Sequence, residues 1–168
     1  MNAFRLYIPV LFVGLSWYPA KAQEIASKPI VKVSGEVTKP LSLSADDLAK
    51  MKHVTAVMKD HDGHDHPYKG VAIQDILELA GVTTGKQLRG KNLGKYLLVK
   101  CADGYEVVFS LAELDSSFTD RVVILADESE GKPLPAGKGP FRLVVPGEKK
   151  PARSSFQVVE FVIRFAKE

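Results

Sequence analysis

Three histidines and three aspartates share one short segment of this chain, and both residue types can bind divalent metals. The segment reads Asp60-His61-Asp62-Gly63-His64-Asp65-His66-Pro67. Imidazole and carboxylate together suit zinc, copper or nickel, although the spacing matches no named metal motif. The alternatives are a solvated loop and a loop that covers a ligand pocket, with His61 as the contact residue. Because histidine changes charge near neutral pH, a functional role here would depend on pH.

Cys101 is the only cysteine and the second candidate for chemistry. Its thiolate could bind a metal, but the residue lies in an apolar run, and free cysteine is among the most buried residue types. A core thiol is therefore the favoured interpretation. A single cysteine forms no intramolecular disulfide, so stability must come from the packed core.

Arg153-Ser154-Ser155 combines a guanidinium with two hydroxyls on one expected loop. Such side chains, together with backbone amides, can hold an anion or a polar ring without a metal. Tyr105 could stack on a flat ring, although a tyrosine just after a hairpin turn more often belongs to the packing.

Strands are the main elements that must position these residues. Alternation and β-branched composition predict strands over 30–37, 53–58, 95–100, 105–109, 121–126, 141–145 and 158–165. In the last strand one face is expected to be core: Val159, Phe161, Ile163 and Phe165. Asp103-Gly104 favours a tight hairpin, and one helical turn is expected over 110–114. Segments 60–67 and 130–140 are predicted as loops because charge, glycine and proline dominate them.

Two short helices complete the expected fold. Ser44 and Asp47 form a capping-box pattern, and Leu48 and Met51 would supply the buried side of the first helix. The second helix places four apolar residues on one face: Ile73, Ile76, Leu77 and Ala80. Gly81 suits a left-handed end to that helix. The pattern predicts an α+β fold, a β-rich mixed sheet or barrel with short helices.

The N-terminal residues are typical of an export signal. Arg5 precedes an apolar stretch over 6–17, and Ala20-Lys21-Ala22 forms a small-x-small cleavage site. We therefore expect residues 1–22 to be removed and residues 23–168 to form one periplasmic domain. The apolar stretch is too short to cross a bilayer, so we expect no membrane insertion after cleavage; a retained anchor is the alternative.

The charge balance argues against a polyanionic partner. The whole chain has a net charge of +3, and loss of residues 1–22 removes Arg5 and Lys21 but no acidic residue, which leaves +1. A nearly neutral domain has no strong field to attract nucleic acid.

Several motifs resemble, in order, those of the sulfite oxidase molybdopterin-binding domain. They are Tyr68-Lys69-Gly70-Val71, Ala102-Asp103-Gly104-Tyr105, Leu125-Ala126-Asp127-Glu128, Gly131-Lys132-Pro133-Leu134-Pro135 and Gly139-Pro140-Phe141-Arg142-Leu143-Val144-Val145-Pro146-Gly147. The resemblance covers most of residues 23–168, and segment 125–147 is its most specific part.

This resemblance implies a cofactor pocket on loops at one edge of the domain. Asp103 stands where the family has an acidic residue near the pterin, and Lys138 stands near a family histidine. Arg142 matches the arginine before the Val-Val-Pro-Gly turn, where a structural ion pair is the alternative to a ligand contact. Arg153-Ser154-Ser155 matches the start of the phosphate-binding segment.

The departures from the family pattern point away from molybdenum. Met58 falls near the position of the family's metal-binding cysteine, and a neutral thioether cannot replace a thiolate on a high-valent metal. Phe156 and Gln157 stand where the family has lysine and tryptophan, which removes a positive charge from the phosphate segment.

The sequence thus predicts an exported binding protein, not an enzyme, that holds a pterin-like molecule without molybdenum. Its expected partner is the periplasmic domain of a membrane signalling protein. The expected ligand-binding residues are Asp103, Tyr105, Lys138, Arg142, Arg153, Ser154, Ser155 and His61. The alternatives are a molybdopterin-dependent oxidoreductase, or a subunit of one, and a periplasmic protein that binds divalent metal.

Overall fold

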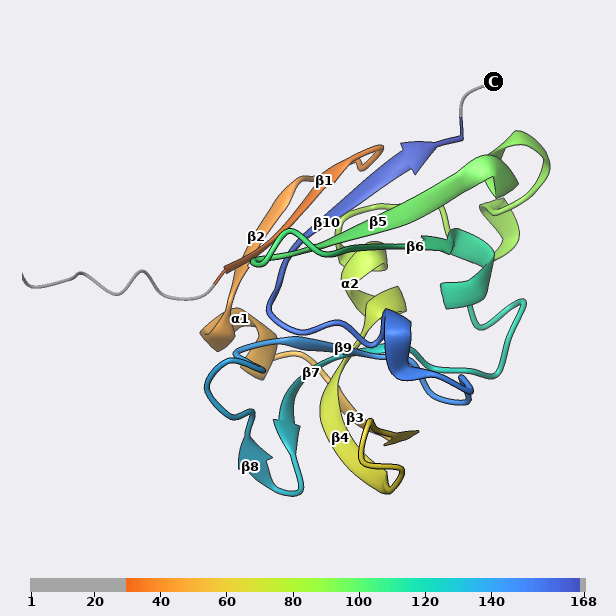
Figure 1. Cartoon of the computed structure of the whole chain (residues 1–168). Coiled ribbons are helices and arrows are strands. Elements are labelled where there is room, and N and C mark those ends of the chain that lie inside the picture. Colours follow the sequence, from red (N-terminus) through yellow and green to blue (C-terminus); the bar gives the residue numbers. More distant parts are fainter. Residues whose placement is uncertain (1–29, 167–168) are drawn as a thin grey trace, which may run out of the picture.

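The computed structural model describes residues 30–166, and strands predominate within them (Figure 1). The expected export signal lies outside the described residues. The strands are β1 (Ile30–Gly35), β2 (Leu41–Ser44), β3 (His53–Lys59), β4 (Asp65–Ala72), β5 (Lys95–Cys101), β6 (Glu106–Ser110), β7 (Ile124–Ser129), β8 (Lys132–Pro133), β9 (Arg142–Val144) and β10 (Val158–Phe165). The helices are α1 (Ala45–Ala49) and α2 (Ile73–Leu79), with 3₁₀ turns η1 (Gly85–Gln87), η2 (Gly90–Gly94), η3 (Leu111–Leu114) and η4 (Pro151–Arg153).

The first sheet has the strand order β2-β1-β10-β5-β6. Strands β1 and β10 are parallel, and the other pairs are antiparallel. Val31 and Val33 of β1 are buried while Lys32 between them is exposed, as the alternation predicts. One face of this sheet therefore belongs to the core.

The second sheet has the order β3-β4-β7-β8, and β9 also pairs with β7. The central strand β7 is buried on both faces, because the consecutive residues Ile124, Leu125 and Ala126 are all inaccessible. Gly70 lets β4 approach β7 closely, since a β-carbon there would overlap the carbonyl oxygen of Leu125. The ladder register shifts beside it, between Lys69 and Gly70.

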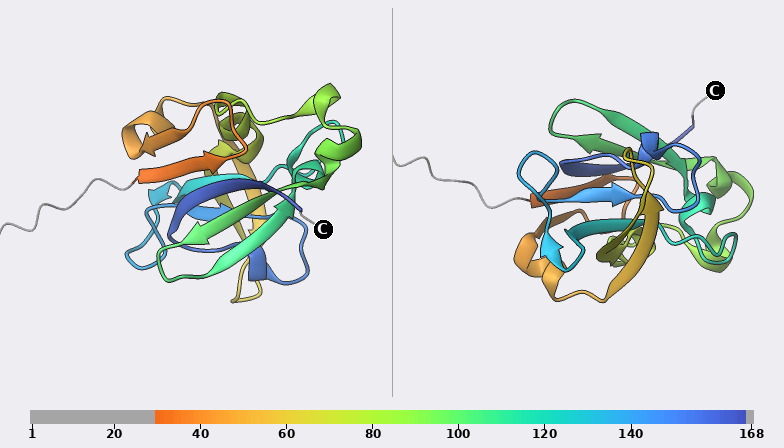
Figure 2. Two further views of the ribbon diagram at one scale, coloured as in Figure 1. Left: turned by 90° about the horizontal axis from the view of Figure 1, so that it is seen from above. Right: turned by 60° about the horizontal axis from the view of Figure 1, so that its bottom comes forward.

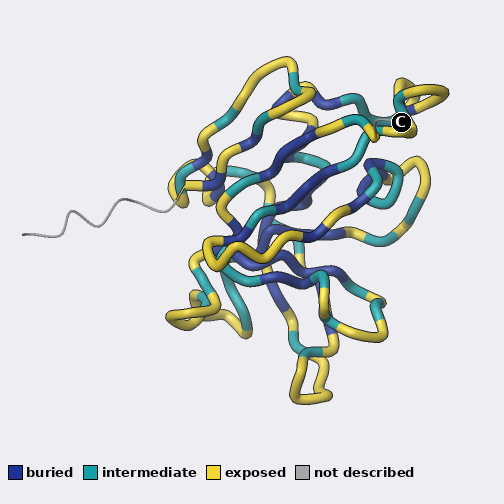
Figure 3. The backbone as a smooth tube through the Cα atoms, turned by 45° about the horizontal axis from the view of Figure 1, so that its top comes forward, coloured by how far each residue is buried: buried dark blue, intermediate teal, exposed yellow. Residues whose placement is uncertain are grey.

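Two apolar clusters hold the sheets together. The main core contains buried residues of both sheets and of α2, and Figure 3 shows these buried stretches running through the middle of the molecule. A smaller outer cluster covers the other face of the second sheet and consists of Ala56, Met58, Tyr68, Ile124, Ala126 and Val144. The second sheet is therefore packed on both sides.

Segment 154–158 joins the two sheets at one corner. The Leu143 amide donates to the Ser155 carbonyl (2.8 Å), and the Val158 amide donates to the Phe141 carbonyl (3.1 Å). The chain then enters β10 of the first sheet (Figures 1 and 2). These backbone hydrogen bonds link the two sheets at this corner and give the fold the barrel-like character that the sequence predicts.

The predicted helices are confirmed. Ser44 and Asp47 form a reciprocal capping box at α1, and Ser110 forms another with Glu113 at the turn η3. Gly81 follows α2 with φ of +69°, the left-handed conformation expected there. None of the helices within residues 30–166 is long and apolar enough to cross a membrane.

Three predicted boundaries are wrong. Only residues 60–64 form a turn, because Asp65, His66 and Pro67 belong to β4 and pair with β3. Strand β7 begins at Ile124, runs on to Ser129 and forms a hairpin with β8 inside the predicted loop 130–140. In both places pairing within a hairpin outweighs the local composition, because Asp65 pairs with Lys59 and Ser129 pairs with Lys132.

The predicted inward face of β10 is wrong at its first position. Val159 is 38% exposed, whereas Val158 is 1% exposed. A register shift between Val158 and Glu160 causes this, because an irregularity in the ladder reverses the faces on one side of it. Phe161 and Ile163 face the core as expected.

Candidate functional site

Arg142 forms the charged centre of the outer face of the second sheet. Its side chain is 1% exposed, and its two terminal nitrogens donate to both carboxylate oxygens of Asp60 at 2.7 and 3.0 Å. It also donates to the hydroxyl of Tyr68, which in turn donates to Asp60 at 2.8 Å. The rings of Tyr68 and Phe156 lie 4.9 and 4.2 Å from the guanidinium carbon. Arg142 is thus held by a carboxylate, a hydroxyl and two aromatic rings.

The ionisation states of this group follow from its geometry. The Arg142 guanidinium holds the pKa of Asp60 well below its usual range, although burial opposes this. Burial, with help from the Asp60 carboxylate, raises the pKa of Tyr68 to about 12. At neutral pH the group therefore contains one cation, one anion and a neutral phenol. The charge of Arg142 is already balanced within the protein.

A hollow of about 300 Å³ opens beside this group. Its lining residues are Asp60, Asp62, His66, Tyr68, Ser129, Glu130, Lys132, Pro133, Leu134, Pro135, Lys138 and Arg142. The volume lies at the lower end of the range for small-molecule sites. The many polar side chains offer both donors and acceptors to a small ligand.

His66 connects two turns at the edge of this hollow. Its Nε2 lies 2.7 Å from Asp62 in the β3–β4 turn, and its Nδ1 lies 2.9 Å from Glu130 in the β7–β8 turn. Only the protonated ring can donate to both carboxylates at once. Glu130 and then Asp62 accordingly raise the pKa of His66 above its ordinary value of 6.5.

We expect a Glu130→Gln substitution to lower the pKa of His66, because it removes the larger of the two effects. Since the folded-state pKa is raised, the contribution of this histidine to stability is complete below pH 6.5 and is lost as the pH rises through the folded-state value. Ring-proton NMR titration of both proteins measures the shift. An unchanged His66 titration would contradict the arrangement.

Most of the predicted ligand residues belong to segment 152–157 or lie beside it, but their side chains do not all line one pocket, and His61 is exposed on the β3–β4 turn outside the hollow. Lys138 and Arg142 line the hollow, and the Lys138 ammonium lies 5.6 Å from the Phe156 ring centre. The Tyr105 hydroxyl donates to the Ala152 carbonyl at 2.9 Å. The Ala102 amide donates to the Gln157 carbonyl at 2.9 Å, so the hairpin that carries Asp103 lies beside the same segment.

Three of the predicted residues are engaged with neighbouring groups of the fold. Arg153 donates from Nε to Glu148 at 2.8 Å and from Nη2 to Glu113 at 3.1 Å, and it lies 4.3 Å from the Phe109 ring centre. The Ser154 hydroxyl accepts from the Val145 amide at 3.0 Å. The Asp103 carboxylate accepts from the Tyr105 amide, which shapes the hairpin turn. None of these three side chains lines the hollow.

Neither candidate sulfur reaches the hollow. Cys101 is 5% exposed and belongs to the main core, where burial raises the pKa of its thiol. The hydroxyl of Ser155 is buried close to that thiol and makes no hydrogen bond of regular geometry. Met58 is 3% exposed and packs in the outer cluster. The hollow therefore has no thiolate donor.

The histidine segment does not form a metal cluster. His61 and His64 are exposed on the β3–β4 turn, while His66 lies in β4 between its two carboxylates. Across residues 30–166, no three histidine, cysteine, aspartate or glutamate side chains are placed to hold one metal ion.

Comparison with known proteins identifies the family. Residues 19–150 match the model of the oxidoreductase molybdopterin binding domain. The chain belongs to this family. The crystal structure of the sulfane dehydrogenase SoxCD from Paracoccus pantotrophus is similar, with a TM-score of 0.64 and 24% identity. The match covers 80% of this chain but 38% of that chain, and at this identity it supports the fold alone. No curated protein sequence matches.

Membership of the oxidoreductase molybdopterin binding domain family confirms the predicted fold class and the resemblance on which it was based. One motif that supports the resemblance, residues 139–147, also contributes Arg142 to the lining of the hollow. The structural ion pair that the sequence left open as the alternative for Arg142 is present, with Asp60 as the partner. The choice of Asp60, the contact with Tyr68 and the His66 bridge were not predicted. A buried arginine in an apolar strand requires a carboxylate partner, but the sequence offers 20 acidic residues and no means of choosing Asp60.

Proposed function

We propose that this chain is an exported, non-enzymatic binding protein that holds a pterin-like molecule in the hollow beside Arg142. The observation that carries the proposal is the hollow itself, which is lined by a family motif residue and by fixed polar groups but by no thiol. The surface around the hollow would differ between the ligand-free and the ligand-bound protein. The periplasmic domain of a membrane signalling protein would recognise this difference.

The chemistry of the hollow suits a flat heterocycle with hydrogen-bonding edges. Ser129 and Glu130 offer acceptors, and Lys132 and Lys138 offer donors. A flat ring could replace the Lys138 ammonium on the exposed part of Phe156, because that contact involves a flexible, exposed side chain. A volume of about 300 Å³ suits a pterin ring system better than a complete phosphorylated cofactor.

The residues present do not fit a metal held by a thiolate. Met58 is packed among apolar residues, and Cys101 lies in the other core. Arg142 and Arg153 are already paired with carboxylates, so neither supplies an uncompensated charge for a phosphate. We therefore propose a pterin without molybdenum as the ligand.

The proposal predicts saturable binding of reduced or oxidised pterin to purified residues 23–168. Calorimetry or ligand fluorescence measures the affinity. We expect Lys138→Ala to weaken binding about tenfold, because a charge-assisted hydrogen bond is lost. Lys91→Ala in the turn η2 is the matched control and should leave the affinity unchanged. Absence of binding at high micromolar pterin would contradict the proposal.

The family membership also favours one alternative, a molybdopterin-dependent oxidoreductase or a subunit of one. Metal analysis of the protein produced in a host that makes the cofactor separates the two functions. Molybdenum in a one-to-one ratio would favour the oxidoreductase, whereas a metal-free protein with a bound pterin would favour the binding function.

A further inference from the structure

Strand β3 forms a free edge of the second sheet. It has seven residues and pairs with β4 along its whole length without a register shift, and no strand lies on its other side within residues 30–166 (Figure 1). Natural sheets usually shorten, bulge or cover such an edge, because unpaired N–H and C=O groups recruit other strands. The edge of β3 shows none of these features in the described part of the chain.

The other outer strands are protected. Strand β2 has four residues and β8 has two, so both edges are short. At the edge of β6, Nη1 of Arg153 donates to the Val108 carbonyl at 3.2 Å. By contrast, no described group outside β4 forms a hydrogen bond with the backbone of residues 53–59. Strand β3 is therefore the edge that is open to a partner.

The free backbone groups include those of Thr55, Val57 and Lys59. Pro67 stands opposite Val57, and its carbonyl accepts from the Glu130 amide (3.2 Å) on the β7 side. The backbone of Pro67 thus faces β7, so Val57 and Pro67 form a pair without mutual hydrogen bonds. The N–H and C=O of Val57 consequently point away from β4, and those of Thr55 and Lys59 do so by alternation.

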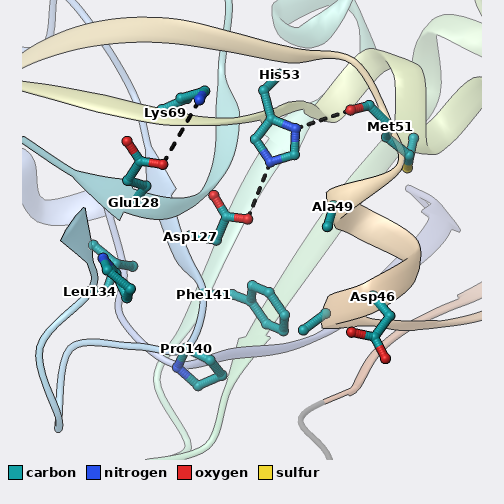
Figure 4. Close-up of a pocket in the computed structure, with 12 residues that line it drawn as sticks. Asp46, Ala49, Met51, His53, Lys69, Asp127, Glu128, Leu134, Pro140 and Phe141 are labelled. Atoms are coloured by element: carbon teal, nitrogen blue, oxygen red, sulfur yellow. Dashed lines mark hydrogen bonds and ion pairs between the residues drawn. The ribbon is translucent and has the colours of Figure 1, made fainter. Parts of the chain in front are cut away.

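Both ends of β3 are held in place. The ring of His53 lies 3.0 Å from the Met51 carbonyl and 3.2 Å from the Asp127 carboxylate, in the cavity beside α1 (Figure 4). After the other end, Asp60 accepts from both terminal nitrogens of Arg142 at 2.7 and 3.0 Å. A strand that is already ordered loses little conformational entropy when another strand adds to it.

The side chains along this edge indicate the chemistry of the partner. Val57 is 54% exposed, which favours another β-branched residue opposite it. Lys52 and Lys59 flank the strand, and neither forms an ion pair with a described residue, although Asp65 lies opposite Lys59 in the ladder. An acidic residue at each end of a partner would complement them. A second copy fits less well, because self-pairing over the whole strand places His53 opposite Lys59 at both ends.

We propose that the edge of β3 docks an extended segment of another protein, antiparallel to β3, with β-branched residues at its centre and an acidic residue at each end. The inference rests on the proposed function for the identity of the partner, the membrane signalling protein, but the edge itself forms without pterin. The β3–β4 turn lines the hollow, so the docked strand lies next to the ligand site.

Titration of the purified protein with the peptide acetyl-Glu-Val-Thr-Val-Thr-Val-Glu-amide, without pterin, tests this site. We expect saturable binding that shifts the amide NMR signals of Thr55, Val57 and Lys59 and slows their hydrogen exchange, because these amides gain acceptors. The amides of Val54 and Ala56 already face β4 and should keep their exchange rates. The same peptide with lysine in place of both glutamates should bind about tenfold more weakly, since both ends then face like charges.

Val57→Pro should weaken peptide binding about tenfold, because it removes an outward donor at an edge position where proline is tolerated. Val57→Thr keeps the donor and the branched side chain and should bind the peptide normally. If Val57→Pro does not fold, peptides N-methylated at the three valines or at the two threonines test the same bonds, and one of the two must fail to bind.

Equal binding of the lysine peptide, unchanged binding in Val57→Pro, or no binding at millimolar peptide would each overturn the proposal. A dimer in sedimentation that Val57→Pro abolishes would also overturn it, because a second copy would then occupy the edge. Pterin titration is scored separately. Peptide binding without any pterin binding contradicts the proposed function and leaves the docking edge standing, whereas pterin binding without peptide binding does the reverse.

Discussion

An Arg142→Met substitution is expected to lower the free energy of unfolding by about 3–5 kcal/mol, because it leaves a buried carboxylate without its cation. The side chain of Asp60 is 10% exposed and directs both oxygens at the guanidinium. Methionine can fill much of the apolar volume between the rings of Tyr68 and Phe156, but it donates no hydrogen bond. The loss thus comes from the unpaired charge and not from a cavity.

Denaturation of both proteins in urea measures this loss. Arg164→Met, at an exposed position of β10, is the matched control and should change stability by less than about 0.5 kcal/mol. The double substitution Asp60→Leu with Arg142→Met should recover much of the stability, because no buried charge then remains unpaired. If Arg142→Met does not fold, Asp60→Asn tests the same pair. A loss below about 1 kcal/mol in Arg142→Met would contradict a structural role.

A Gly70→Ala substitution is expected to cost about 3 kcal/mol or more, since the added methyl group overpacks the backbone of β7. The new β-carbon would overlap the Leu125 carbonyl oxygen and would lie 2.5 Å from the α-carbon of Ala126. Backbone atoms of a central strand cannot move aside as a flexible side chain can. The β4–β7 ladder would have to separate where it places Tyr68.

Gly94→Ala is the control for this prediction. A β-carbon at Gly94 would meet no atom within 4 Å, and its backbone lies outside the left-handed region. Thermal unfolding of the two variants should therefore give a large decrease for Gly70→Ala and little change for Gly94→Ala. Similar melting temperatures for both would show that β4 can move away from β7 at little cost.

Gly70 and Arg142 show the structural role of two motifs that support the family resemblance. Gly70 of the Tyr-Lys-Gly-Val motif brings β4 against β7, and that contact sets Tyr68 on the outer face beside Arg142 of the Phe-Arg-Leu-Val-Val-Pro-Gly motif. Both motifs therefore stabilise the second sheet whether or not a ligand is bound.

The sequence by itself determined the local elements and the family. Two-residue alternation marked β1, reciprocal capping marked α1, and Gly81 marked the end of α2, because each signal depends on neighbours a few residues away. The ordered motifs over 68–147 identified the family, which the match over residues 19–150 confirms.

Only the tertiary structure decided which side chains meet. Arg142 and Asp60 are 82 residues apart, and His53 and Asp127 are 74 apart. Such pairings depend on how two sheets and their registers fit together, which local composition does not encode. The same reason explains why Val158 replaced Val159 in the core. It also explains why the contacts of Arg153 with Glu113 and of Ser154 with the Val145 amide could not be read from the sequence.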